Sequence, residues 1–459
     1  MSRPVRLWPA LLLAAILAAA AAAVAVSAEC GKPPPLPPVD AEGLERQMLD
    51  LSKLSDDPFP AVTRVLFTEH DMKARTFVKS LMTNAGLTIR EDPMGNIFGR
   101  WEGSDPTAGA VLTGSHCDAI PLAGLYDGVL GVLGGIEALA ALKRAGFKPR
   151  RSLEVMMFTS EEPTRFGLGC IGSRGMAGTL TPEVLASIPD INGTNFLEAA
   201  NAAGYGGSDM AAMLAGTRVP EGRISHFVEL HIEQGPNLEN DGTNIGIVTA
   251  IAAPATLKVR FVGNGGHAGA LLMPFRKDAG LAAAELALAV EKAALGTGAI
   301  DTVATTGLVK IFPGAVNSVP RDAQIEIDVR DIDEARRDRV VQEIKDAANE
   351  IAARRGTAVE LEMLNADPPA TSGAAILEAA EASVKQMGVS YTKMVSRAYH
   401  DSLFMARIAP TAMIFIPCRG GVSHRPDEYA SPEDMGRGVT ALALTMARLA
   451  GAEGCHDEL

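Results

Sequence analysis

Residues 109–128 read GAVLTGSHCDAIPLAGLYDG, and this stretch decides the fold of the chain. Its apolar start predicts a buried strand, and residues 128–145, which are apolar at helical spacing, predict a helix. The polar loop between them carries one imidazole and two carboxylates, from His116, Asp118 and Asp127. Open α/β sheets place their ligands where a strand runs into such a loop before a helix. The stretch therefore predicts a ligand site, although an ordinary hydrogen-bonded turn also fits this composition.

Similar side chains follow other strand-like segments. Glu161 and Glu162 end a buried strand at 153–158, so one of them is able to bind metal while the other takes a proton from water. His231 stands in an alternating strand, and His424 follows the last buried strand. Solvated acids and satisfied structural histidines are the alternative. Since four of only 8 histidines gather at such positions, with His400 as the fourth, we favour a site for manganese or zinc.

Length and composition bound the class of protein. A chain of 459 residues is too long for one core, so two domains are expected. The net charge of −13 argues against nucleic acid and against an anionic membrane as partners. The five cysteines are too few and too scattered for a disulfide framework or a thiolate zinc site.

Both ends of the chain carry targeting features. Residues 1–28 have a basic start, an apolar run and a small-residue cleavage pattern, which predict a signal peptide, with an uncleaved anchor as the alternative. A Pro-rich spacer follows at 29–40. The chain ends in HDEL at 456–459, an endoplasmic-reticulum retention signal, and Asn192 begins a glycosylation sequon. We therefore expect the protein in the lumen of the endoplasmic reticulum.

The order of elements predicts an α/β fold with a second domain inserted in it. Residues 41–248 alternate helices and strands, which implies a mainly parallel or mixed sheet with helices on both faces. Within them the pattern of 41–86 is read as helical throughout. Residues 249–366 follow a β-α-β-β-α-β order, predicting a ferredoxin-like α+β lid or dimerisation domain. Residues 367–451 return to the first domain, and a tail occupies 452–459.

Taken together, these motifs resemble the amidase/hydantoinase/carbamoylase branch of the two-metal hydrolases. The resemblance covers roughly residues 45–450 and agrees in motif order, spacing and inserted domain. Within the branch the chain is most similar to the ureidoglycolate amidohydrolase group of plants. The motifs are GSHCD at 114–118, DG at 127–128, SEE at 160–162, HIEQG at 231–235, GNGGHAGA at 263–270, RAYHDSLFMAR at 397–407 and SHRPDE at 423–428.

The resemblance implies a set of metal ligands and a catalytic acid–base group. Five ligands of two metal ions are implied, namely His116, Asp127, Glu162, His231 and His424. Asp127 bridges the two ions, Asp118 orients His116, and Glu161 is the general base and acid. Manganese is the expected metal, and the residues alone do not exclude zinc.

The resemblance also implies how substrate is held and that the protein is a homodimer. His267 would donate to the developing oxyanion in the partner subunit's site, which makes it the second catalytic residue. Arg330 would bind the substrate carboxylate as a bidentate fork. The remaining substrate contacts implied are Gln234, Asn317, Tyr399 and His400.

Two other functions compete with hydrolysis of ureidoglycolate. The resemblance implies that allantoate amidohydrolases usually have Gly where this chain has Tyr399. The phenol would shorten the pocket, as a smaller substrate requires. A catalytically silent ureide-binding relative would need a broken ligand set, and none of the six metal and base positions is substituted. The sequence therefore favours a metal-dependent amidohydrolase that acts on a small ureide.

Overall fold

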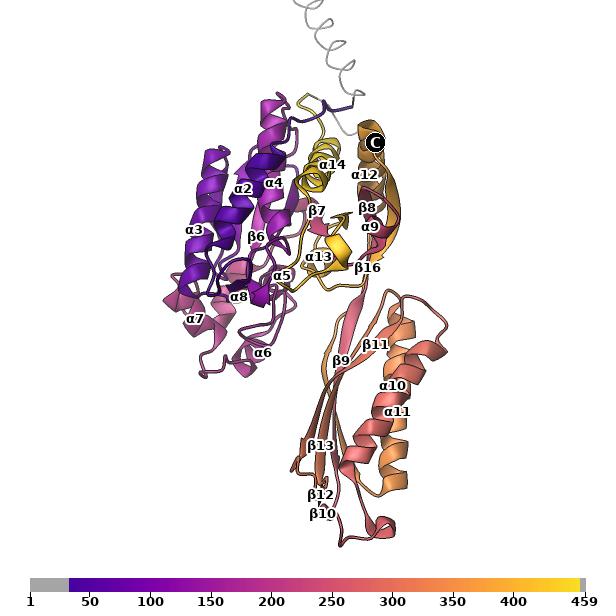
Figure 1. The fold of residues 1–459 in the computed structure, drawn as a ribbon. Helices are drawn as coiled ribbons and strands as arrows, with labels where there is room; N and C mark the ends of the chain where they lie inside the picture. Colours follow the sequence, from indigo (N-terminus) through magenta and orange to yellow (C-terminus); the bar gives the residue numbers. More distant parts are fainter. Residues whose placement is uncertain (1–32, 455–459) are drawn as a thin grey trace, which may run out of the picture. The chain divides into compact units, whose positions relative to one another are not determined.

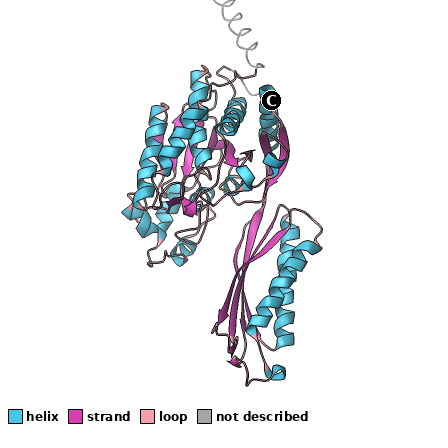
Figure 2. Ribbon diagram, in the orientation of Figure 1, coloured by secondary structure: helices cyan, strands magenta, loops and turns pink. Residues whose placement is uncertain are grey.

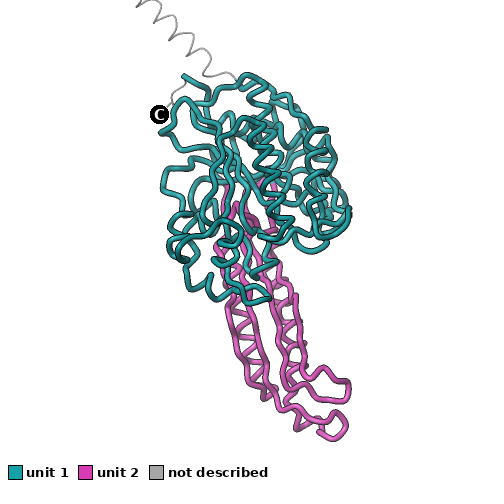
Figure 3. The backbone as a smooth tube through the Cα atoms, turned by 90° about the vertical axis from the view of Figure 1, so that its left-hand side faces the viewer, with its two compact units in different colours: residues 1–247, 373–393, 404–459 teal, residues 248–372, 394–403 magenta. Residues whose placement is uncertain are grey.

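The computed structural model describes residues 33–454, which form two compact units (Figure 3). Within this range the first unit contains residues up to 247 together with 373–393 and the residues from 404 on. The second unit contains 248–372 and 394–403. The sequence predicted that residues 394–403 belong to the first domain. The predicted signal peptide, Cys30, Cys455 and the HDEL sequence lie outside the described residues.

The first unit is built on a mixed sheet (Figure 1). Its strands lie in the order β8 (Ile245–Ile251), β17 (Thr411–Ile416), β7 (Ile224–Ile232), β4 (Ala110–His116), β6 (Leu153–Phe158), β3 (Ile97–Trp101) and β2 (Thr88–Glu91). The pairs β17–β7, β7–β4 and β4–β6 are parallel, whereas β6–β3 and β3–β2 are antiparallel. The carboxyl ends of the four central strands therefore meet at one edge of the sheet.

Helices cover both faces of this sheet (Figure 2). Alternate residues of β4 point to opposite sides, and Val111 packs in the cluster that contains helices α4 (Val129–Arg144) and α14 (Pro432–Ala450). Its neighbour Leu112 packs on the other side with Met176 of α5 (Ile171–Ala177). The other helices of this unit are α2 (Ala41–Ser52), α3 (Glu69–Asn84), α6 (Pro182–Ser187), α7 (Phe196–Ala202), α8 (Met210–Thr217), α9 (Asn237–Asn240) and α12 (Ala374–Met387).

The predicted α/β class is confirmed, and one helical prediction is wrong. Residues 41–86 are not helical throughout, because α2 and α3 are separated by a loop and by the short strand β1 (Val62–Arg64), which pairs with β5 (Ala119–Ala123). Pro58 and Pro60 stand in that loop and lack the N–H groups that a helix needs. Within residues 33–454, no helix combines the length and the apolarity needed to span a membrane.

The second unit contains a four-stranded antiparallel sheet in the order β11-β13-β9-β14. The sheet and its two helices, α10 and α11, enclose a separate apolar core. Their order along the chain is β-α-β-β-α-β, as predicted for a ferredoxin-like unit. The elements are β9 (Ala253–Val262), α10 (Ala279–Gly296), β11 (Val303–Phe312), β13 (Asp322–Asp331), α11 (Glu334–Arg355) and β14 (Ala358–Ala366).

Short elements complete the second unit and mark the passages between the two units. The pair β10 (Gly266–His267) and β12 (Ser318–Val319) forms a small ribbon, and a 3-10 helix spans Met273–Phe275. Strand β15 (Ala370–Thr371) pairs with β8 at residues 250–251. The chain passes from one unit to the other within β8, between residues 372 and 373, and within β16 (Tyr391–Ser396) and α13 (Ser402–Met405).

Candidate active site

The predicted metal ligands come together at the carboxyl edge of the first unit's sheet. His116 is the last residue of β4, and His231 stands near the end of the neighbouring parallel strand β7. Glu161 and Glu162 follow the end of β6, and His424 lies in the loop after β17. Each side chain therefore owes its place to a strand that ends at the same edge.

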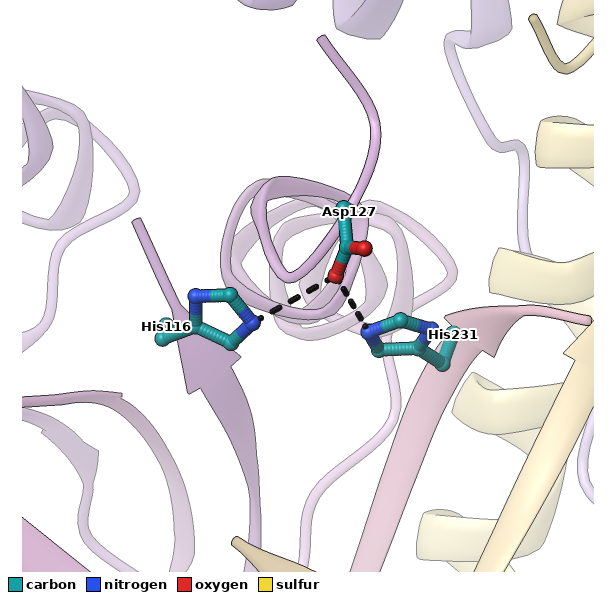
Figure 4. A group of neighbouring side chains, drawn as sticks. All are labelled: His116, Asp127 and His231. Carbon is teal, nitrogen blue, oxygen red and sulfur yellow. Dashed lines mark ion pairs between the residues drawn. The ribbon is translucent and has the colours of Figure 1, made fainter. Parts of the chain in front are cut away.

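Asp127 lies at the centre of this group. Its Oδ1 is 3.5 Å from His116 Nε2 and 3.2 Å from His231 Nε2, and both rings point at this one oxygen (Figure 4). Its Oδ2 is 3.2 Å from His424 Nε2, which in turn is 3.4 Å from Glu162 Oε1. The two oxygens thus belong to two donor groups, His116–Asp127–His231 and Asp127–Glu162–His424, in each of which the candidate ligand atoms lie within 4.8 Å of one another.

The outer nitrogens of the two buried rings fix which nitrogen faces Asp127. His116 Nδ1 is 3.0 Å from the backbone oxygen of Asp118, and His231 Nδ1 is 2.9 Å from that of Ile232. A carbonyl only accepts, so each Nδ1 carries the hydrogen and the neutral ring directs the lone pair of Nε2 toward Asp127. Lone pairs directed at a carboxylate are unfavourable unless a cation lies between them, which is either a proton on Nε2 or a metal ion. This donor arrangement fits metal ions.

The electrostatics of the cluster point the same way. Asp118, Asp127, Glu161 and Glu162 are all at least nine-tenths buried. Burial would lower the pKa of His116, but the charge of Glu161 and of the other carboxylates outweighs it and raises that pKa well above its usual value. Burial would raise the pKa of Asp127, but its hydrogen bonds with three imidazoles hold it well below the usual value. The cluster therefore attracts positive charge, which divalent ions would supply.

The two remaining ligands also show shifted pKa values. A hydrogen bond to Asp127 raises the pKa of His424 to about 9. Burial, together with the neighbouring carboxylates, raises the pKa of Glu162 to about 7. Both shifts favour the protonated form, as expected for buried groups in a crowded set of carboxylates.

Asp118 supports the site differently from the prediction. The acceptor for His116 Nδ1 is the backbone oxygen of Asp118, since the carboxylate oxygen lies farther away at 3.7 Å. The carboxylate instead accepts hydrogen bonds from the backbone N–H groups of Glu161 at 3.3 Å and Glu162 at 3.0 Å. Asp118 thus orients the ring through its main chain and the two acids through its side chain.

Gly128 is required by the close approach of His116. Its φ of 67° lies in the left-handed region, and a Cβ built on it would stand 2.4 Å from the His116 ring. The Gly128 N–H also lies 3.2 Å from His231 Nε2. The dipeptide Asp127-Gly128 therefore places a carboxylate between two imidazoles where a larger residue would displace one of them.

Glu161 stands beside the ligand cluster without belonging to either donor group. Its Oε2 is 3.7 Å from His116 Nε2, and its Oε1 is 3.6 Å from Cys170 Sγ. Burial raises the pKa of the buried thiols Cys117 and Cys418 to about 12, which keeps them protonated and leaves the chemistry to the oxygen and nitrogen donors.

Gln234 reaches the cluster, but through a contact that the sequence did not suggest. Its Nε2 donates to Asp127 Oδ2 at 2.6 Å. Its Oε1 is buried and has no hydrogen-bond partner among the described residues. The sequence also gave no role to Ser423 or Glu428, which contact Asp127. They flank His424 in SHRPDE, and that proximity was the only available signal.

The other predicted residues belong to the second unit. His267 and Asn317 lie on or beside the exposed β10–β12 ribbon. Arg330 pairs with Asp328 through two hydrogen bonds of 2.9 and 3.1 Å and donates to the backbone oxygen of Arg397. The hydroxyl of Tyr399 donates to Asp367 at 2.9 Å, and His400 Nε2 lies 3.0 Å from Ser396 Oγ.

Comparisons with known proteins agree with this site. Residues 112–448 match the model of peptidase family M20/M25/M40. The chain is 57% identical to a ureidoglycolate hydrolase of Oryza sativa subsp. japonica over 415 residues, which is 90% of this chain and 85% of that protein. It is 33% identical to an allantoate amidohydrolase of Bacillus subtilis over 391 residues, 85% of this chain and 93% of that protein.

Solved structures give the same assignment. Crystal structures of AtUAH in complex with glyoxylate and with (S)-hydroxyglycine match at a TM-score of 0.82 and 55% identity. Each match covers 90% of this chain and 99% of the solved chain. Because the family model matches residues 112–448, and because the fold and the paired donor groups agree with it, the chain belongs to peptidase family M20/M25/M40.

Proposed function

We propose that this protein is a two-metal amidohydrolase that hydrolyses (S)-ureidoglycolate to glyoxylate, ammonia and carbon dioxide. The proposal rests on the position of Asp127. One of its carboxylate oxygens faces His116 and the other faces His424, and Glu161 lies beside both donor groups. Held by His116, Asp127, Glu162, His231 and His424, two divalent ions would lower the pKa of the attacking water toward neutrality. Side chains of the protein transfer the proton and hold the substrate.

Glu161 accepts the proton of the attacking water and returns it to the leaving nitrogen. Attack of one water at the ureido carbonyl breaks its bond to the nitrogen that is attached to the glycolate carbon, and the carbamate that forms decomposes to carbon dioxide and ammonia without further water. The amine product is hydroxyglycine, which loses ammonia to give glyoxylate. Both molecules are bound in the AtUAH crystal structures, which supports this route.

Gln234 is proposed to hold the ureido group. Its buried Oε1, with no hydrogen-bond partner among residues 33–454, is able to accept from a ureido N–H, while its Nε2 stays on Asp127. Arg330 keeps its proposed role at the carboxylate, and Asp328 then acts as the group that orients the guanidinium. The roles of His267, Asn317 and His400 stay predictions.

Product analysis of the purified protein tests the substrate. With manganese present, we expect kcat/KM for ureidoglycolate to exceed that for allantoate by at least about 10²-fold, because we propose that the phenol of Tyr399 shortens the pocket. Tyr399→Gly should narrow this ratio, whereas Tyr399→Phe keeps the ring and should leave it unchanged. Equal rates on the two substrates in the unmodified protein would discard ureidoglycolate and leave the two-metal mechanism in place.

Manganese is the metal we propose, since the donors are imidazole and carboxylate without thiolate. Zinc accepts the same donors. Metal analysis of protein purified from its own cells, without added metal, distinguishes the two, and a stoichiometric zinc content would contradict the manganese assignment.

We propose a homodimer formed by the second unit. Leu281, Leu288 and Leu295 are exposed on α10 at seven-residue spacing, which aligns them on one face. Strand β11 is at an edge of its sheet and exposes Ile311 and Phe312. Sedimentation equilibrium should give twice the chain mass, and Leu288→Glu should weaken the dimer. A monomer at micromolar concentration would contradict the proposal.

We also propose that the protein resides in the lumen of the endoplasmic reticulum, on the basis of the N-terminal signal and the terminal HDEL. Deleting residues 456–459 should cause a tagged protein to be secreted. Retention of the shortened chain inside the cell would count against the retention signal.

A further inference from the structure

Glu428 is a buried carboxylate next to the metal ligands that the proposed mechanism does not use. It lies in the loop between β17 and α14 and is 3% exposed. A carboxylate at this depth needs several hydrogen bonds to offset the loss of solvent. The hydrogen-bond partners of Glu428 show which part of the site it positions.

The side-chain hydrogen bonds of Glu428 lead to Asp127 or to its neighbours. The Oε1 atom accepts from the backbone N–H of Tyr126 at 2.7 Å and from that of Asp127 at 3.0 Å. The Oε2 atom lies 3.0 Å from Ser423 Oγ, and this hydroxyl is 2.7 Å from Asp127 Oδ2. Glu428 thus fixes the main chain of Asp127 directly, and it shares with the side chain of Asp127 the single hydrogen of the Ser423 hydroxyl.

Ser423 and Gln234 act on the same oxygen of Asp127. The Gln234 amide nitrogen is 2.6 Å from Asp127 Oδ2 and 3.2 Å from Ser423 Oγ. Oδ2 is therefore held by two polar partners besides His424, whereas Oδ1 faces His116 and His231. Rotation of the carboxylate would break these bonds, so the division between the two donor groups is fixed.

Gly124 provides the space that Glu428 needs. A Cβ at this position would stand 2.4 Å from both Cβ and Oε1 of Glu428. Even alanine at position 124 would therefore displace the glutamate, which gives a second way to disturb the same contacts.

We propose that Glu428 is a positioning residue that orients the bridging Asp127 so that each carboxylate oxygen serves a different metal ion. The inference rests on the proposed two-metal function and concerns the chain's own residues. Groups that hold metal ligands in place are typically worth 10–100-fold in metal affinity. Glu428 would act through Asp127 without touching substrate.

Metal binding to the apoprotein tests the proposal without reference to turnover. Manganese affinity is measured by competition with a fluorescent chelator, and stoichiometry by elemental analysis. We expect Glu428→Ala and Gly124→Ala each to lower manganese affinity about 10–100-fold. Glu428→Gln should stay within about threefold of the unmodified protein, because its amide oxygen still accepts from both N–H groups and its amide nitrogen still reaches Ser423. The control Asp427→Ala changes an exposed carboxylate in the same loop and should have no effect.

Steady-state kinetics at saturating manganese adds a second readout. Since Glu428 holds a metal ligand, the activity of Glu428→Ala should recover as manganese rises, with KM for the ureide unchanged. Unchanged manganese affinity in Glu428→Ala overturns the proposal, as does an effect of Glu428→Gln as large as that of the alanine variant. If Glu428→Ala does not fold, Ser423→Ala replaces it as the test, because it removes only the hydroxyl. Ser423→Ala should lower manganese affinity severalfold, and unchanged manganese affinity in this variant overturns the proposal. Failure of the unmodified protein to bind two ions would instead refute the two-metal function.

Discussion

Glu161→Gln is expected to lower kcat about 10²–10⁴-fold while both metal ions stay bound. The side chain stands 3.7 Å from His116 Nε2 and lies outside both donor groups, so its loss should not empty the site. Glutamine has nearly the same shape but does not accept a proton from water. The measurement is kcat for the ureide together with the metal content of the same sample.

The neighbouring Glu162 provides a matched control. It lies 3.4 Å from His424 and belongs to one donor group, so Glu162→Gln should lose metal as well as activity. If Glu161→Gln lost metal to the same degree, its proposed acid–base role would be replaced by a role as ligand. If it kept normal activity, the proton would have to be carried by another group.

Asp127→Ala is expected to prevent binding of both ions and to reduce turnover to background. All three imidazoles of the site lie within 3.5 Å of this one carboxylate. Removing it takes a shared ligand from both groups and leaves the remaining carboxylates buried without a bridge. Elemental analysis of the dialysed protein measures the loss.

His231→Ala distinguishes a bridging role from a general disturbance of the site. His231 belongs to one group, so the other, made of Asp127, Glu162 and His424, should still bind a single ion. The expected stoichiometries are about two for the unmodified protein, one for His231→Ala and none for Asp127→Ala. Two ions in Asp127→Ala would contradict the bridging assignment.

The strand–loop–helix unit around His116 was predictable because its signals are local. The apolar run before His116 and the apolar helix after Gly128 each follow from a few neighbouring residues, and α4 lies where the sequence placed it. Strand β4 continues through His116, which was expected in the loop, and the loop itself contains the strand β5. The break at 53–68 was missed although Pro58 and Pro60 stand inside it. The residues on either side keep a helical periodicity that masks the break made by the two prolines.

The supporting contacts were not predictable because they join residues far apart in the sequence. Glu428 contacts Asp127 only once β17 and β4 lie in one sheet, and no local pattern records this. Asp118 was expected to orient His116 by its carboxylate, yet the backbone oxygen lies closer and the carboxylate holds the Glu161–Glu162 segment. Which atom of Asp118 accepts each hydrogen bond depends on the backbone geometry, and the residue types alone do not specify that geometry.

Anomalous diffraction from crystals grown with manganese tests the central claim most directly. Two peaks are expected at the carboxyl edge of the first unit's sheet. One should lie among His116, His231 and Oδ1 of Asp127, and the other among Glu162, His424 and Oδ2 of the same carboxylate. A single peak, or two peaks that do not share Asp127, would contradict the account.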